Sequence, residues 1–555
     1  MTYTAVTFAP VQSFIRSSRK LRDVYGSSLL LSHLARALHD DATAKVSAAG
    51  GSVISPADVK STRGVPNTLL ILGSYHKGDA QQAMQRAWHQ VLHACREWLE
   101  DLPCKQLAND ARPWPPASWG NKEWEEGWGA SWNAVERHSW ELFHGQGTTI
   151  ASAEEALGFA KQQRAWEVPN WTGESSTLSS VEAIVRPGMA RTFDPFRPAS
   201  ATCRQEARDF LQVLCHPKNL GEAFAGDREE ISLTELVKRL VTYGQVAPKA
   251  FDCDRATIHE ILPERFESLS GRMASSAAKR PETVIWFMAD GDEVGNHIRS
   301  FRQNATEDPA KEASARSAFS RAMRNWAAEL YAKVPESMGA DRATVVYAGG
   351  DDVLGALHES EPGCRDLCAD HLMQWLRLFP VLWNQAKQPI TASMGVVWAD
   401  SSVPQREALQ HTRDAEASAK ARGRDRFALR LIYASGNHLE WTCPWTWLDP
   451  ILMAYRDREG RAYASASAAK PPRWRHLAED LLWLKERHAI GDGAPGDAAI
   501  QVAEGLLNAY FPGWFPPAPP EQGNPSRRLD HWLLDLGRVM AGLERWRATN
   551  EAVAR

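Results

Sequence analysis

The sequence predicts an α+β protein with two ferredoxin-like domains, a helical insertion between them and a helical C-terminal domain. Two observations predict this fold. Residues 1–105 run strand, helix, strand, strand, helix, and residues 281–435 repeat that order and add further elements. A β-α-β-β-α-β order is typical of a ferredoxin-like unit. Because the two copies begin about 280 residues apart, their shared topology suggests an internal duplication.

The first copy begins with TYTAVTFA, which predicts a strand. A long helical segment follows, as one helix or two, with Pro10 near its N-terminus, where proline is tolerated. Residues 51–56 and 67–73 are short strand candidates, and the amphipathic residues 81–102 predict a helix.

Residues 106–280 form the predicted insertion, rich in Trp, Pro and Gly at first and then largely helical. Trp124, Trp128 and Trp132 recur every fourth residue, which places them on one face of a helix. This face could stack nucleotide bases. A packing stripe against the rest of the protein, or against a partner, is the favoured interpretation.

The second copy opens on TVIWFMAD, a continuous apolar run typical of a strand buried on both faces. Residues 343–358 predict a hairpin, and residues 390–399 and 427–433 predict further strands with helices between them. From residue 436 to 555 the pattern is helical, interrupted by a Pro-rich connector.

Composition narrows the classes of function. A net charge of −4 means that any contact with nucleic acid must use a local patch or partner subunits. No apolar run approaches the roughly 18–20 residues that cross a bilayer, and the start does not resemble a signal peptide. We therefore expect a cytoplasmic protein without membrane contact. The eight cysteines include no CxxC pair, which favours reduced thiols.

The strongest chemical feature is the segment YAGGDDVLGAL. Gly349 and Gly350 lie between apolar β-formers, and glycine permits the positive φ angles that a tight hairpin needs. Asp351 and Asp352 follow at once. Adjacent strand residues point to opposite faces, so two neighbouring carboxylates can share a metal site only at a turn. Aspartate and glycine are also common in ordinary hairpins.

A second acidic group follows the apolar strand in ADGDEVG. Asp290 and Asp292 come directly after buried residues, where carboxylates are unfavourable unless a positive charge compensates. Together with the hairpin acids they could hold two Mg²⁺ or Mn²⁺ ions, which bridge phosphates and activate a hydroxyl. Asp290 is the primary candidate, because Asp292 could instead cap the next helix.

A third feature is the helix end DAEASAKARGRDRF. Lys420 lies near the end of this helix, Gly423 is a plausible C-cap, and Arg424 follows. A lysine there can serve the helix dipole alone. Its position after the strand at residues 390–399 favours a contact with phosphate.

These stretches resemble the palm domain of nucleotide cyclases and GGDEF-type diguanylate cyclases, although AEASAKARGR lacks one residue of that family's spacing. GGDD preceded by ADGDEVG resembles more specifically the large subunit of type III CRISPR effector complexes. The opening FAPVQSFIRSSRKLRDVYGSSLLLSHL is similar to that of the first palm in the Cmr-type subunit. GVPNTLL and REEISLTELVKRL resemble two further landmarks of that subunit.

The resemblance implies two palm domains with two ATP molecules between them. On binding of target RNA, the GGDD palm would make cyclic oligoadenylates, with metal at Asp351, Asp352 and Asp290 and a phosphate at Lys420. Gly291, Gly349 and Gly350 would line the nucleotide site. The first palm would bind nucleotide without chemistry, with Ser13 as a contact. Other Cmr-type subunits, guide RNA and target RNA are the implied partners.

Two departures from the relatives bear on function. Many relatives begin with an HD nuclease domain, whereas here the first palm starts at residue 3 and His39-Asp40 lacks the surrounding histidines. We therefore expect no metal-dependent DNase activity. Relatives often carry a Cys-x-x-Cys zinc site between the palms. Cys203 stands alone there, and Cys364 with Cys368 does not complete a tetrahedral set, so the ligands for a structural zinc are incomplete.

Two alternatives remain at this point. One is a catalytically silent scaffold of the same complex, which the acids at Asp290, Asp351 and Asp352 argue against. The other is a free-standing cyclic dinucleotide synthase, which the large helical regions and paired palms argue against.

Overall fold

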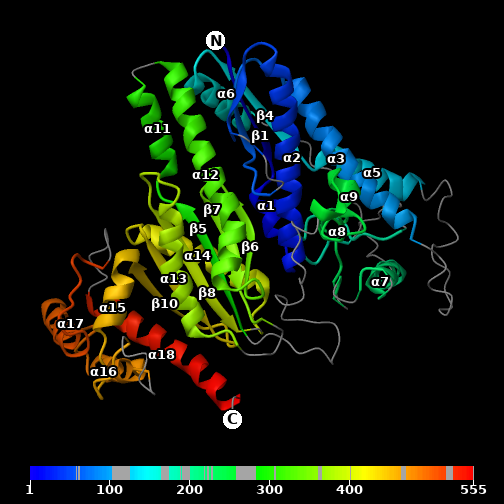
Figure 1. Cartoon of the computed structure of the whole chain (residues 1–555). Coiled ribbons are helices and arrows are strands. Elements are labelled where there is room, and N and C mark those ends of the chain that lie inside the picture. Colours follow the sequence, from blue (N-terminus) through cyan, green and yellow to red (C-terminus); the bar gives the residue numbers. More distant parts are fainter. Residues whose placement is uncertain are drawn as a thin grey trace. The chain divides into compact units, whose positions relative to one another are not determined.

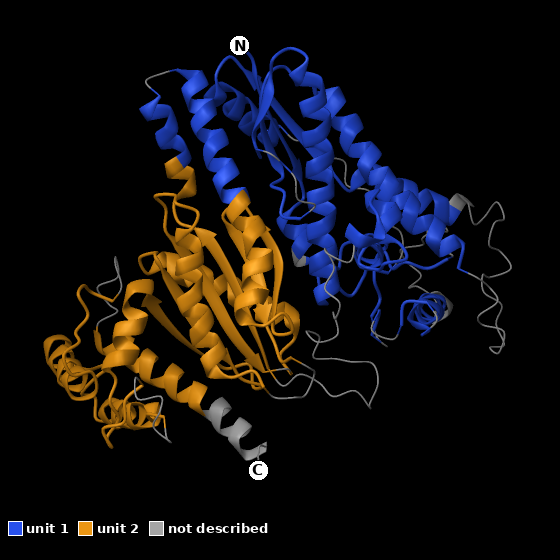
Figure 2. Ribbon diagram, in the orientation of Figure 1, with its two compact units in different colours: residues 1–278, 298–324 blue, residues 279–297, 325–555 orange. Residues whose placement is uncertain are grey.

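The computed structural model describes most of the chain. The described residues are 1–57, 59, 63–102, 125–163, 174–187, 189, 201–217, 219–221, 224–226, 229–257, 283–305, 308–360, 366–400, 402–463, 471–520 and 529–553. Two compact units divide the chain (Figure 2). The first comprises residues 1–278 and 298–324, and the second comprises residues 279–297 and 325–555.

The first unit contains a four-stranded antiparallel sheet in the order β2-β3-β1-β4 (Figure 1). This is the strand order of the ferredoxin-like fold that the sequence predicts. β1 is central because its residues are buried from Tyr3 to Phe8. The strands are β1 (Tyr3–Ala9), β2 (Ser52–Ser55), β3 (Thr68–Leu72) and β4 (Glu141–Gly147).

The fourth strand comes from the range predicted as insertion. β4 pairs with β1 along its whole length, from Tyr3↔Gly147 to Ala9↔Glu141. This sheet therefore contains strands from both sides of the predicted boundary at residue 105. The finer division into four domains stays a prediction.

Helices make up most of the rest of the first unit. They are α1 (Gln12–Arg16), α2 (Leu21–Ser47), α3 (Lys77–Glu100), the π-helical turn η2 (Glu125–Gly129), α5 (Ala130–His138), α6 (Ile150–Gln162), α7 (Ala201–Cys215), α8 (Leu233–Leu240) and α9 (Ala247–Phe251). The division between the units falls within α11 (Val294–Asn304) and α12 (Pro309–Met338).

The tryptophan stripe is a packing feature. Trp128 is 0% exposed and Trp132 is 3% exposed, and their ring centroids lie 5.6 Å apart in the core of the first unit. The Trp128 indole N–H donates to Glu100 at 3.0 Å. Neither ring is available to stack on a base, whereas Trp124 lies outside the described residues.

The second unit contains a six-stranded mixed sheet in the order β10-β9-β8-β5-β7-β6. Its part β8-β5-β7-β6 repeats the strand order of the first sheet, so the predicted repetition of one supersecondary unit is confirmed in topology. The strands are β5 (Thr283–Gly291), β6 (Ala343–Gly349), β7 (Asp352–Leu357), β8 (Ala392–Asp400), β9 (Arg426–Ile432) and β10 (His438–Pro444).

The order of elements positions the site. β5 is flanked by β7 and β8, which explains its continuous apolar run. α13 (Ala369–Asn384) leads into β8, and α14 (Gln405–Ala421) leads from β8 into the parallel strand β9. Gly395 of β8 lets α14 approach, since a Cβ there would lie 2.2 Å from the Thr412 carbonyl oxygen.

The C-terminal part is not wholly helical. Residues 438–444 form β10 and extend the sheet, which corrects the expectation of helix from residue 436 onward. Trp441 and Cys443 are both 0% exposed, which explains the pairing with β9. After the turn η4 (Trp445–Trp447) come α15 (Leu448–Ala454), α16 (Trp474–Glu486), α17 (Gly496–Tyr510) and α18 (Leu529–Val553). Among the described residues, no helix is both long and apolar enough to span a bilayer.

Candidate active site

The acidic hairpin is a tight two-residue turn. β6 ends at Gly349 and β7 begins at Asp352, and these two residues are paired. Gly350 and Asp351 form the turn, and Gly350 has a φ of +71° that glycine adopts without strain. Only the second glycine therefore needs a positive φ. The turn places Asp351 and Asp352 at the tip of the hairpin.

Asp290 lies next to this tip because β5 and β7 are neighbours. The pairing of Ala289 with Val353, continued by one residue, sets Asp290 opposite Asp352. Gly291 makes room for the other acid. A Cβ built on Gly291 would lie 3.0 Å from the Asp351 Cβ and 3.3 Å from its Oδ2. The acids that the sequence predicts to meet thus lie side by side.

The carboxylates disturb one another's protonation. Burial, and then the charge of Asp290, raise the pKa of Asp351 to about 6. Crowding by surrounding protein, the hydrogen bond with Asp290 and repulsion from both neighbours raise the pKa of Asp352 well above its ordinary value. Asp352 is exposed by surface area, so water moderates this effect. The cluster holds more negative charge than its surroundings accept, which is the situation that a bound cation relieves.

Lys420 supplies a positive charge to this cluster. It lies in the last turn of α14, and its ammonium group is ion-paired with Asp290 and with the Glu416 Oε1, the latter at 2.7 Å. Burial disfavours the charged form of Lys420, but the two carboxylates outweigh burial and raise its pKa. The contact that the structure shows for Lys420 is to a carboxylate. Its predicted contact with phosphate stays a prediction.

Glu416 escaped the sequence analysis, although it lies one helical turn before Lys420. Its pKa is raised by burial, while Lys420 opposes that rise. The sequence could have indicated Glu416, because a Glu and a Lys four residues apart on one helix face commonly form an ion pair.

Asp292 faces other partners. It is 4% exposed, and its oxygens accept hydrogen bonds from the Thr391 hydroxyl at 2.8 Å, the Ser393 hydroxyl at 2.7 Å and the Asp425 N–H at 3.0 Å. These donors already satisfy the carboxylate, and they tie β5 to β8 and to the loop before β9. The proposal of Asp292 as a metal ligand therefore remains the weaker one.

Hard carboxylate oxygens are the ligands that Mg²⁺ and Mn²⁺ prefer. Asp290, Asp351 and Asp352 fit such an ion by their chemistry and by their mutual repulsion. Among the described residues, no three His, Cys, Asp or Glu side chains gather tightly enough to hold a metal. Asp290, Asp351 and Asp352 are the residues that would hold such an ion, and Asp290 is paired with Lys420 in its place.

Ser13, His39 and Asp40 lie in the first unit. Ser13 is exposed on α1, and its carbonyl accepts from the Ser17 N–H and hydroxyl. His39 and Asp40 lie within α2 rather than at its end, and the His39 Nδ1 is 3.0 Å from the Asp40 Oδ1. The side chain of Cys203 and all of Cys364 fall outside the described residues. The incomplete set of ligands for a structural zinc therefore stays a prediction.

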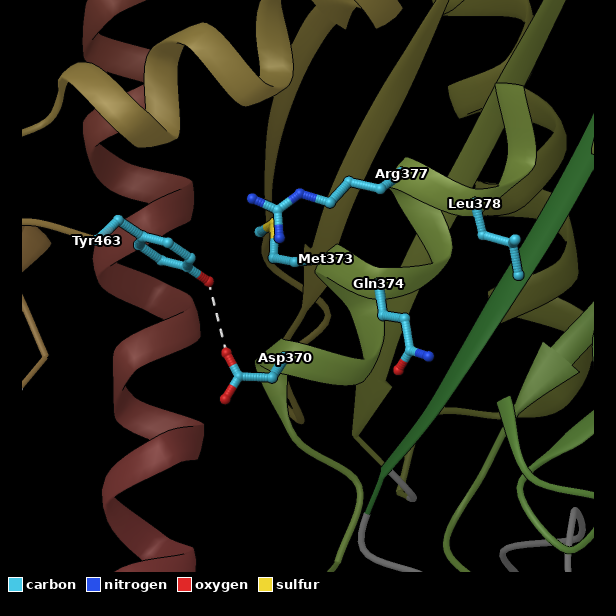
Figure 3. Close-up of a pocket in the computed structure, with 6 residues that line it drawn as sticks. All are labelled: Asp370, Met373, Gln374, Arg377, Leu378 and Tyr463. Atoms are coloured by element: carbon cyan, nitrogen blue, oxygen red, sulfur yellow. Dashed lines mark hydrogen bonds between the residues drawn. The ribbon is translucent and has the colours of Figure 1, made fainter. Parts of the chain in front are cut away.

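A separate hollow of about 420 Å³ lies on α13 (Figure 3). Its wall includes Arg377 and Tyr463, and the Tyr463 hydroxyl donates to the Asp370 Oδ1 at 3.4 Å. Arg377 is already paired with Asp449 at 2.5 Å. None of the predicted site residues lines this hollow.

Two family models match the chain. Residues 284–428 match the second palm domain of Cas10/Cmr2, and residues 3–62 match the N-terminal domain of the CRISPR-associated protein Cmr2. No curated protein sequence matches.

Several solved structures align with the chain. A type III-B Cmr-beta complex in the apo state aligns with a TM-score of 0.54 and 10% identity, over 98% of this chain and 82% of that one. A Csm1–Csm4 subcomplex of the type III-A CRISPR-Csm interference complex gives 0.47 and 13%, over 98% and 69%. A Csm1–Csm4 cassette in complex with cA4 gives 0.45 and 14%, over 97% and 69%. Only the first alignment is close enough to support the fold.

Two ferredoxin-like sheets, one with an acidic hairpin beside a strand-end aspartate, define a protein of the palm-domain class. Residues 284–428 and 3–62 are thus similar to domains of Cas10/Cmr2 and Cmr2, and the fold of the chain is similar to that of a type III-B Cmr-beta structure.

Proposed function

We propose that this subunit synthesises cyclic oligoadenylates from ATP when its RNA-guided complex binds target RNA. The observation that carries the proposal is the meeting of Asp290, at the tip of β5, with Asp351 and Asp352 at the hairpin. A structural role alone gives no reason to place three mutually repelling carboxylates around one point.

The chain's own residues would act as follows. Asp290, Asp351 and Asp352 hold two Mg²⁺ or Mn²⁺ ions, which supply activation of the attacking hydroxyl and neutralisation of the pyrophosphate. Lys420 is the counter-charge of Asp290 until an ion takes that role. Its ammonium group is then free to contact a phosphate of ATP. Gly349, Gly350 and Gly291 have no side chains, so they would leave room for the nucleotide beside the carboxylates.

The proposed partners are other Cmr-type subunits, guide RNA and target RNA. A net charge of −4 gives the whole chain little general attraction for nucleic acid, which favours RNA binding through the assembled complex. The predicted nucleotide contact at Ser13 would belong to a first palm that binds ATP without reacting it.

One assay separates this proposal from its rivals. The chain is incubated with ATP and Mg²⁺ or Mn²⁺, with and without partner subunits, guide RNA and matching target RNA, and products are resolved by chromatography and mass spectrometry. Cyclic oligoadenylate that depends on target RNA supports the proposal. Product without RNA indicates a free-standing cyclase, and no product under any condition indicates a scaffold.

A double variant tests the site itself. D351A/D352A should abolish synthesis while assembly and RNA binding persist, because carboxylates at a turn contribute little to the core. The control is Asp497→Ala, an exposed acid at the start of α17 in the same unit. Mn²⁺ binding measured by electron paramagnetic resonance should fall in D351A/D352A alone. Synthesis at near wild-type rate in the double variant would refute the assignment.

A further inference from the structure

Helix α8 is buried on every side. All eight residues from Leu233 to Leu240 are buried, including Lys238 at 1% and Arg239 at 0% exposure. Ser232 begins the helix, since its hydroxyl accepts from the Glu235 N–H and its own N–H donates to the Glu235 carboxylate. Charged residues are rarely this buried unless each has a partner. Lys238 and Arg239 both have partners in the opening segment of the chain, and Arg239 also binds Glu229 and the Phe224 carbonyl.

Lys238 holds the end of α1. Its Nζ donates to the Phe14 carbonyl at 2.6 Å and to the Ser17 carbonyl at 3.3 Å, and it lies 4.0 Å from the Phe14 ring centroid. α1 has five residues, and the last carbonyls of a helix have no partner within it. A helix this short is not stable alone. The buried ammonium group therefore acts as its C-terminal cap.

Arg239 holds the beginning of α2. The Asp23 Oδ2 accepts from the Arg19 and Lys20 N–H groups, both at 2.8 Å, and so caps that helix. Arg239 binds Asp23 through two nitrogens, at 2.6 and 3.2 Å, and donates to the Glu229 Oε2 at 2.7 Å. Lys238 and Arg239, which are adjacent in α8, thus bind the two ends of segment 14–23.

One cation of this cluster reaches the surface. The Glu229 carboxylate lies 3.7 Å from the Arg19 Nε and 3.7 Å from the Lys20 Nζ. Asp23 and Glu229 thus face Arg19, Lys20 and Arg239, while the Glu235 and Glu182 carboxylates act on the buried Lys238. Arg19 is 45% exposed, so its guanidinium group reaches solvent at the loop between α1 and α2. An exposed cation on a fixed loop suits a phosphate group.

We propose that Lys238 and Arg239 are positioning residues that hold residues 12–23 in the conformation that binds a nucleoside triphosphate. This inference rests on the proposed function, in which the first palm binds ATP near Ser13. A shift of α8 would displace α2, because the two helices are in close contact. A Cβ on Gly26 would lie 1.8 Å from the Lys238 carbonyl oxygen. The affinity of the first palm for ATP therefore depends on two residues more than 200 positions away in the chain.

The test compares Lys238→Met with Lys249→Met, an exposed lysine on α9 in the same unit. Both changes are made in the full-length D351A/D352A background, in which turnover is absent and nucleotide binding to the second palm is weakened. Hydrogen exchange of residues 12–23 and equilibrium binding of radiolabelled ATP are measured. K238M should speed exchange in that segment at least tenfold and weaken ATP binding at least fivefold, and K249M should do neither.

Unchanged exchange in K238M would overturn the clamp, and faster exchange without weaker ATP binding would overturn its role in nucleotide affinity. If the background protein binds no ATP, the proposed function of the first palm fails, while the exchange comparison still decides whether α8 holds the segment. If K238M does not fold, Glu229→Gln replaces it. This change keeps the side-chain shape and removes one of the two charges opposite Arg239, so it should speed exchange of the same segment by a smaller factor.

Discussion

Replacing Asp351 with asparagine should raise the thermal stability of the second unit when divalent cations are absent. The pKa of Asp351 is raised from 3.8 to about 6 in the folded protein, first by burial and then by Asp290. The native state therefore binds more protons than the unfolded state between these values. Stability falls as the pH rises from about 4 through 6 and stays lower above it. Asparagine carries no charge and avoids this loss.

The expected magnitude follows from the shift. About two pKa units correspond to roughly 3 kcal/mol at about 1.36 kcal/mol per unit. Asp351 is only partly buried, so screening by water reduces the gain to about 1–2 kcal/mol. For a unit of this size, 1 kcal/mol moves the midpoint of unfolding by about 2–4 °C. D351N should therefore melt about 2–8 °C above the wild type at pH 7.5.

The assay is calorimetry in EDTA at pH 7.5 and pH 4. The difference between D351N and the wild type should become small at pH 4, where the folded carboxyl is protonated and the unfolded one, with an ordinary pKa of 3.8, is close to half protonated. Mg²⁺ should then stabilise the wild type more than D351N. Asp497→Asn, an exposed acid of the same unit, should be neutral or slightly destabilising. A D351N protein that melts at or below the wild-type midpoint at pH 7.5 in EDTA would refute the electrostatic argument.

Three further changes have defined outcomes. Gly26→Ala inserts a Cβ 1.8 Å from a carbonyl oxygen of α8 and should lower the free energy of unfolding of the first unit by about 2–4 kcal/mol in urea. Gly158→Ala is the control, because Gly158 lies on α6 with open space around it. This change should be neutral or stabilising by up to about 1 kcal/mol. Arg239→Met leaves two buried carboxylates without their partner and should cost about 3–5 kcal/mol in the same assay. Lys420→Met should lower the rate of oligoadenylate synthesis by about 10²–10³ while it strengthens Mn²⁺ binding, because Asp290 loses its competing cation.

Each of these has a contrary result. Equal unfolding curves for the two glycine variants would show that α2 and α8 can separate without loss. A stable R239M protein would show that the two carboxylates are not dependent on that guanidinium group. Weaker Mn²⁺ binding in K420M would show that the ammonium group supports the metal site instead of competing with it.

The fold was predictable where the pattern was apolar and periodic. The continuous run ending at Asp290 predicted a central strand, and the hairpin at Gly350 followed from turn chemistry. β4 was missed because its two glycines lower strand propensity. The structure shows why they are there: a Cβ on Gly145 would lie 2.2 Å from the Leu157 N of α6, and one on Gly147 would lie 2.1 Å from the Ser152 Oγ. Close packing by a helix overrode local propensity.

The site was predictable in its acids and less so in its partners. Strand-end and turn positions brought Asp290 to Asp351 and Asp352, since both features reach the same edge of one sheet. The sequence could not decide which way Asp292 points, because the donors that satisfy it come from β8 and from the loop before β9, about 100 and 130 residues away. Its role follows only from tertiary contacts.

The Asp292 carboxylate connects three chain segments through its hydrogen bonds. Its oxygens join the end of β5, the start of β8 and the turn that leads out of α14, the helix that carries Lys420. Loss of this carboxylate should displace Asp290 and Lys420 of the proposed site together. A survey of substitutions scored by product alone would therefore count Asp292 among the proposed catalytic residues, although its observed contacts are to the donors that hold these segments together.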